Sequence, residues 1–129
     1  GGLGRSRITS AQSTKIPMTD RPLPDVDALR QRLGGSRDAA DSLLAMFASD
    51  APRQILRLRE ALDRADFKEL KYVAHSLKGS LLWLGATAAA EAARALEDGL
   101  KDGCVEGARR RAHDLDAEVR AVVQAIEAR

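Results

Sequence analysis

From Pro24 onward, hydrophobic positions recur every three or four residues, the spacing that places them on one face of an α-helix. Short segments rich in Gly, Asp or Ser separate these stretches. No stretch alternates hydrophobic and polar residues with a period of two, as a half-buried β-strand would. The pattern predicts an all-α protein, an antiparallel up-down four-helix bundle with a short additional N-terminal helix.

The N-terminal helix is expected to begin after Asp25, a typical N-cap residue, and to end at Gly34-Gly35. Its hydrophobic positions are Val26, Leu29 and Leu33. Ser36 is the N-cap candidate of the first long helix, with Asp38 in the first turn. Pro52 interrupts that helix, and because its ring clashes with the carbonyl one turn back, we expect a kink there. The hydrophobic stripe of this helix is Leu44, Phe47, Ala51, Ile55, Leu58 and Leu62.

The second long helix is expected to open at Asp66-Phe67-Lys68-Glu69, which has the form of a capping box, and to stop at Gly85. Its stripe is Phe67, Leu70, Ala74, Leu77, Leu81 and Leu84. The third is expected to end near Asp102-Gly103, with the stripe Ala89, Ala93, Leu96 and Leu100. The last carries Ala108, Ala112, Leu115, Val119, Val122 and Ile126. Aromatic residues make up only 3% of the chain, which fits helices packed through Ala and Leu.

Residues 1–20 lack the helical pattern and are rich in Gly, Ser and Thr, so we interpret them as a flexible tail, a linker or an expression remnant. Residues 21–129 are then the helical domain. Residues 1–17 hold basic residues and no acidic ones, whereas the whole chain has a net charge of only +2. The domain itself is therefore close to neutral and lacks the electrostatic footprint of nucleic-acid binding.

The single cysteine, Cys104, excludes an internal disulfide, and no Cys/His cluster has the spacing of zinc ligands. The charge-free run at residues 79–90 is too short and too rich in Gly, Ser and Thr to span a bilayer. We therefore expect a cytoplasmic protein with no membrane insertion, metal site or cofactor of its own. Cys104 is expected to lie in a helix-capping region, and His113 to be a solvated surface residue.

His75 lies outside the hydrophobic stripe of its helix. Three of the six residues that share its helix face, reached in steps of three and four, are lysines; the six are Lys68, Lys71, Tyr72, Lys78, Gly79 and Leu82. Glycine inside a helix costs about 1 kcal/mol relative to alanine, and Gly79 serves no turn. Its missing side chain clears space one turn from the imidazole.

An imidazole is nucleophilic near neutral pH, and Lys78 can reach toward an anion attached to the ring of His75. An exposed nucleophile with open access and nearby cations suits capture of a phosphoryl group. On periodicity alone, a solubilising surface with an incidental histidine is the alternative interpretation.

The stretch His75-Ser76-Leu77-Lys78-Gly79-Ser80 resembles the H-x-L-K-G-S signature of histidine-containing phosphotransfer (HPt) domains. These domains relay phosphoryl groups in two-component and multistep phosphorelay signalling. Leu84-Gly85-Ala86 also matches the L-G-A turn of the family, and Leu96-Glu97 fits its L-E pair. The resemblance covers approximately residues 25–127 and implies the fold that the periodicity predicts independently.

The resemblance implies a role for each matching residue. His75 would be the phosphoacceptor through Nε2, Lys78 would stabilise the phosphoryl group or reach the partner, and Gly79 would allow close approach. Glu97 would orient the histidine by accepting a hydrogen bond from Nδ1–H, which fixes the tautomer. Arg94, one turn before Glu97, would join the same surface network.

The implied partners are response-regulator receiver domains. The receiver, and not this chain, would carry the aspartyl phosphate and the Mg²⁺. The residues expected to contact a docked receiver are Lys71, Tyr72, Leu82, Arg94 and Lys101. No kinase or hydrolase site is visible, so the chain would be a phosphotransfer module, either free-standing or part of a hybrid histidine kinase.

The chain departs from the family pattern at Leu81-Leu82-Trp83, where many relatives have small or polar residues. Trp83 is expected either to form part of a docking or self-association patch or to cover the end of the bundle. Two other functions stay open at this point. One is the phosphorylated N-terminal domain of a chemotaxis-type kinase, and the other is a non-phosphorylated binding or dimerisation module.

Overall fold

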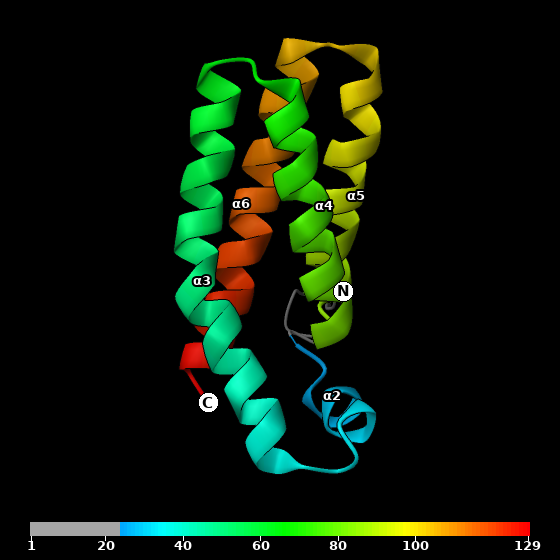
Figure 1. Ribbon diagram of the computed structural model, residues 1–129, viewed down its shortest axis with the longest axis vertical. Helices are drawn as coiled ribbons and strands as arrows, with labels where there is room; N and C mark the ends of the chain where they lie inside the picture. Colours follow the sequence, from blue (N-terminus) through cyan, green and yellow to red (C-terminus); the bar gives the residue numbers. More distant parts are fainter. Residues whose placement is uncertain (1–23) are drawn as a thin grey trace, which may run out of the picture.

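The computed structural model describes residues 24–129. Four long helices form an antiparallel bundle in which each helix packs against the next and α6 returns to α3 (Figure 1). The helices are α3 (Arg37–Asp63), α4 (Phe67–Leu84), α5 (Thr87–Gly99) and α6 (Val105–Glu127). A short helix, α2 (Val26–Arg32), precedes them, and a 3₁₀ turn, η3 (Leu100–Asp102), follows α5.

The described residues contain no β-strand, so the all-α prediction is confirmed. The predicted tail, residues 1–20, lies outside the described residues. No helix between residues 24 and 129 is long and apolar enough to cross a membrane.

The predicted helix starts rest on side-chain caps. Asp25, Ser36 and Asp66 each accept a hydrogen bond of 3.1 Å from the backbone amide three residues later. Only one of the two hydrogen bonds of the predicted capping box at Asp66 forms. The Glu69 carboxylate accepts from Arg57 of α3 at 2.7 Å and not from the backbone amide of Asp66. The Asp66 amide donates to the carbonyl of Ala61 at 2.8 Å. An ion pair between two helices thus takes the place of the local hydrogen bond that completes a capping box.

Pro52 lies inside α3, which remains helical from Arg37 to Asp63. The part of α3 near its N-terminus leans away from the direction of the rest (Figure 1), as expected for a helix that contains a proline. This lean carries the start of α3 toward α2, beneath the end of α4.

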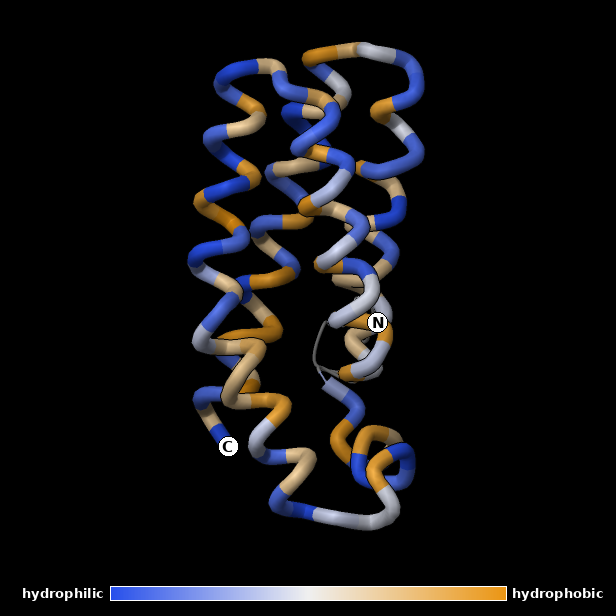
Figure 2. The backbone as a smooth tube through the Cα atoms, in the orientation of Figure 1, coloured by the Kyte–Doolittle hydropathy of each residue, from blue (hydrophilic) through white to orange (hydrophobic). Residues whose placement is uncertain are grey.

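Hydrophobic and hydrophilic residues are interspersed along every long helix (Figure 2), and hydrophobic side chains from all four helices form one buried core. The predicted stripes are buried for the most part, but Leu62, Phe67 and Ile126 are only partly buried. Val73 and Ala61 are fully buried although no stripe included them. Each long helix packs against at least two others, so its buried face is wider than one row of side chains. Toward the ends of the helices, fewer neighbours cover the hydrophobic residues.

The turn after α4 joins the bundle to α2. Gly85 has φ 74°, in the left-handed region that favours glycine. A Cβ on Gly85 would come within 2.6 Å of the Cβ of Asp25, and the Asp25 amide donates to the Leu84 carbonyl at 2.9 Å. Glycine is therefore needed here both for the turn and for the close approach of α2.

Asp116 is the one charged residue that is buried in the described part of the chain. Burial by itself raises the pKa of its carboxyl, but hydrogen bonds from Arg120 and Arg59, both 2.7 Å, outweigh this and lower the pKa. The Arg59 bond ties α6 to α3. The sequence alone does not predict this bond, because Arg59 and Asp116 lie on different helices, 57 residues apart.

Candidate functional site

His75 projects from the outer surface of α4, with 68% of its side chain exposed to solvent. The buried residues Ala74 and Leu77 on the same helix face the core, which holds the backbone of α4 in place while the imidazole stays outside. Gly79, one turn further along, is open: an added Cβ would meet no atom within 4 Å. The imidazole is therefore approachable from solvent.

Glu97 of α5 lies directly beside the histidine. His75 Nδ1 is 2.9 Å from Glu97 Oε2, and Lys78 Nζ is 3.0 Å from Glu97 Oε1. The Glu97 side chain is only 14% exposed. The antiparallel packing of α4 and α5 thus brings together two residues that are 22 positions apart.

Partial burial alone raises the pKa of Glu97, but the hydrogen bonds and charges of Lys78 and His75 outweigh that effect. The net pKa of Glu97 is therefore lower than its ordinary value. A carboxylate can only accept a hydrogen bond, so the contact with Nδ1 requires the proton to sit on that nitrogen. In the neutral imidazole, Nε2 then carries the lone pair.

Lys78 lies one turn after His75 on α4, as the helical spacing predicts. Its side chain is 24% exposed and its ammonium group pairs with Glu97, a contact that the sequence alone did not predict. The carboxylate of Glu97 therefore contacts both His75 and Lys78.

The residues predicted to contact a docked receiver lie around this centre. Lys71 precedes His75 by one turn, and Lys101 follows Glu97 by one turn in η3; both are exposed. Because α4 and α5 are antiparallel, both lysines are displaced from His75 toward the same end of the bundle. Leu82 is 55% exposed. Arg94 pairs along its own helix with Glu91 at 2.7 Å instead of bonding Glu97.

Tyr72 is 61% exposed and lies toward α3, where the Arg57 guanidinium stands 5.4 Å from the centre of its ring. Arg57 also donates to Glu69. Sequence reasoning missed Arg57, because its helical neighbours along α3 give no sign of the contact across to α4.

The other two titratable candidates stay apart from this centre. Cys104 is the N-cap of α6, where its Sγ accepts from the Gly107 amide at 3.4 Å, as expected for a capping residue. His113 is exposed on α6. Within residues 24–129, no group of three or more His, Cys, Asp or Glu side chains could hold a metal ion.

Gly79→Ala is expected to raise the free energy of unfolding by roughly 0.5–1 kcal/mol, because alanine is the better helix former and the added methyl meets no atom. Urea unfolding followed by circular dichroism measures the change. A destabilised variant would contradict the open environment described here.

In a comparison with protein-family models, residues 42–128 match the Hpt domain. The match spans nearly all of α3 and the whole of α4 to α6, including His75 and Glu97, and it leaves α2 outside. No curated protein and no solved structure matches the chain.

Proposed function

Because the chain belongs to the Hpt domain family, we propose that it is a phosphorelay intermediate that accepts a phosphoryl group on His75 from a receiver-domain aspartate and passes it to another receiver. Hpt domains are phosphotransfer modules and not enzymes in the usual sense. The observation that supports the assignment to His75 is its exposed ring with Nδ1 against the Glu97 carboxylate.

In the proposed step, the lone pair of His75 Nε2 attacks the phosphorus atom of the aspartyl phosphate. The bond between phosphorus and the aspartate oxygen breaks, and the carboxylate leaves with the electron pair. The proton on Nδ1 stays where it is, so the phosphorylated ring carries a positive charge. Glu97, 2.9 Å from Nδ1, is in place to offset that charge as it develops. Transfer to a second receiver is the reverse reaction.

The partner would supply the aspartyl phosphate and the Mg²⁺ that its acidic pocket holds. The exposed lysines Lys71 and Lys101 would face that acidic pocket and speed the encounter, with Tyr72, Leu82 and Arg94 completing the contact surface. Gly79 would let the two backbones approach. The proposal includes a cytoplasmic location, in keeping with a single unpaired cysteine. It also includes a hybrid histidine kinase among the partners.

The proposal is tested by mixing the purified chain with phosphorylated receiver domains and Mg²⁺ and following the label. We expect the chain to gain phosphate that is stable in alkali and labile in acid, the behaviour of phosphohistidine. A second, unphosphorylated receiver should then remove it. Failure of every receiver of the same genome to transfer label in either direction would contradict the proposal.

Glu97→Ala should slow transfer by about 10-fold or more, the size of effect seen when the carboxylate partner of a functional histidine is removed. The reason is that Nδ1 then has no acceptor and both tautomers are populated. Glu97→Gln keeps an oxygen that can accept from Nδ1–H and should retain more of the rate. Rapid-quench measurement of label transfer gives both rates, and equal rates for the two variants would contradict the orienting role.

The stability of the chain should also depend on the Glu97 carboxyl at acid pH. Its pKa is lowered in the folded chain, so its favourable contribution is present above the ordinary glutamate pKa of about 4.3 and disappears as the pH falls through the lowered value. The free energy of unfolding of the wild type should exceed that of Glu97→Gln by up to about 1 kcal/mol near neutral pH, and the difference should narrow below pH ~4. Urea unfolding across this pH range measures it. A gap that is constant with pH would contradict the ion pair.

A further inference from the structure

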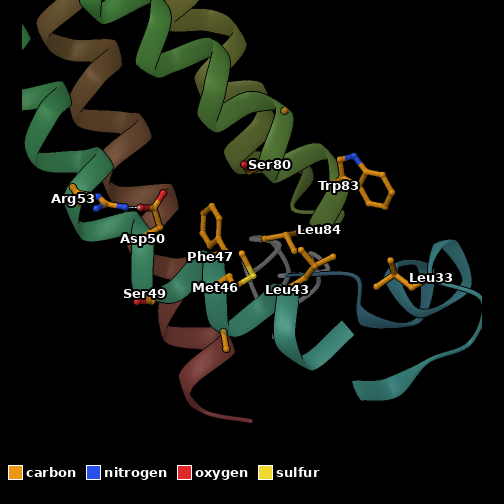
Figure 3. Close-up of a pocket in the computed structure, with 12 residues that line it drawn as sticks. Leu33, Leu43, Met46, Phe47, Ser49, Asp50, Arg53, Ser80, Trp83 and Leu84 are labelled. Atoms are coloured by element: carbon orange, nitrogen blue, oxygen red, sulfur yellow. Dashed lines mark hydrogen bonds and ion pairs between the residues drawn. The ribbon is translucent and has the colours of Figure 1, made fainter. Parts of the chain in front are cut away.

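A groove of about 1110 Å³ runs between α3 and the end of α4, and Leu33, the C-cap residue of α2, also lines it. Its walls are mainly apolar. Figure 3 shows Met46 and Phe47 rising from α3 toward Ser80 and Leu84 of α4, with Trp83 at the outer edge. Met46 and Trp83 are 66% and 52% exposed, so a half-exposed aromatic ring and a flexible thioether line one hollow surface.

Trp83 is held in this position by α2. The Arg32 guanidinium lies 5.8 Å from the centre of the indole ring. It also donates hydrogen bonds to the Leu82 carbonyl, at 3.2 Å, and to the Trp83 carbonyl. A large aromatic side chain that is exposed yet already ordered loses little conformational entropy when a partner covers it. Such side chains are common among the contacts that dominate binding energy.

The groove is continuous with the histidine site. Gly79 belongs to both, because it lies one turn from His75 and also lines the groove. The polar rim of the groove near Gly79 carries Arg53, which is 76% exposed and paired with Asp50 three residues earlier. An exposed pair of this kind contributes little stability, so Arg53 can exchange Asp50 for an acidic group of a partner.

We infer that the groove seats the receiver domain and that Trp83 is a specificity-determining contact in it, an inference that rests on the proposed function. A receiver domain that approaches Nε2 of His75 over Gly79 must also cover the end of the groove that Gly79 lines. The fitting partner presents an apolar helix or ridge to Met46 and Trp83 and an acidic edge to Arg53.

The two ends of the groove differ in how closely their residues follow the family pattern. Gly79 and Ser80 lie in the stretch that resembles the family signature, whereas Trp83 departs from the family pattern. Arg32, which holds Trp83, lies outside the region that matches the Hpt domain. The end near His75 would therefore accept receivers in general, and the end at Trp83 and α2 would select among them.

The test uses the fact that Trp83 is the only tryptophan of the chain. A tryptophan-free receiver is titrated into the whole chain, first while tryptophan emission is recorded and then in a transfer assay. We expect the emission to move to shorter wavelength and to saturate with the receiver. Trp83→Ala should raise the KM for the receiver by about 10-fold or more and change the maximal rate little, and Trp83→Phe should restore most of the affinity.

Leu56→Ala is the matched control, because Leu56 is 55% exposed on α3 and lines a different hollow, with residues of α6. It should leave the KM unchanged. Equal KM values for Trp83→Ala and wild type would overturn the inference, as would an emission shift that appears with rising concentration of the chain alone, which would assign the groove to a second copy. If His75 is phosphorylated normally in these cases, the proposed function stands; if no receiver transfers phosphate, it falls as well.

Discussion

His75→Ala is expected to abolish the uptake of phosphate from a phosphorylated receiver, lowering the transfer rate by more than about 10³-fold. Alanine has no lone pair to attack phosphorus, and no other group in the described site replaces it, since Lys78 is engaged by Glu97. The variant should fold normally because the His75 side chain is 68% exposed. Label transfer followed by gel autoradiography measures the loss.

His113→Ala is the matched control, because His113 is also exposed but lies on α6. It should accept phosphate at the wild-type rate. His75→Gln adds a second check, since it keeps polarity and similar bulk while removing the nucleophile. Acid-labile label that persists in His75→Ala would show that another residue is the acceptor. In that case the role assigned to Glu97 would be wrong too.

Leu96→Ala is expected to lower the free energy of unfolding by about 3 kcal/mol, within the range of roughly 2–5 kcal/mol for buried leucines. The Leu96 side chain is fully buried, and its truncation leaves a cavity where α5 packs on its neighbours. A loss of this size is a large fraction of the usual stability of a domain and should lower Tm by roughly 10–20 °C. Thermal and urea unfolding measure the two quantities.

The control for this variant is Leu56→Ala, because Leu56 is 55% exposed and its truncation should cost less than about 1 kcal/mol. Comparable losses in the two variants would contradict the arrangement of the core. Leu96→Ala should also weaken the hold on the adjacent Glu97, so transfer should fall more steeply with temperature than in the wild type.

Much of the fold was predictable because its signals are local. Asp25, Ser36 and Asp66 accept hydrogen bonds from amides only three residues away, and such contacts depend on neighbouring residues alone. The alternative partner of Glu69 was not predictable in this way. Arg57, which draws the Glu69 carboxylate away from the Asp66 amide, lies on a different helix, and nothing in a single sequence sets the alignment of two helices.

In the candidate site too, the features that depend on one helix were predictable, and the contacts between helices were not. The position of His75 outside the hydrophobic stripe indicated an exposed ring, and the unneeded Gly79 indicated open space beside it. The geometry agrees with both. The resemblance to HPt domains, and not the spacing of residues, pointed to Glu97. Only the packed helices show that Lys78 pairs with Glu97 and that Trp83 borders a groove between α3 and α4.

By itself, the amino-acid order determined that this chain forms helices, where they start and stop, and which histidine stays outside the core. Caps, turns and helical faces act over three or four residues, so they can be read along the chain. Tertiary structure alone decided which carboxylate meets which cation and which exposed side chains form one surface. Those contacts join residues on different helices, and they depend on the depth and alignment of packing that the whole core sets together.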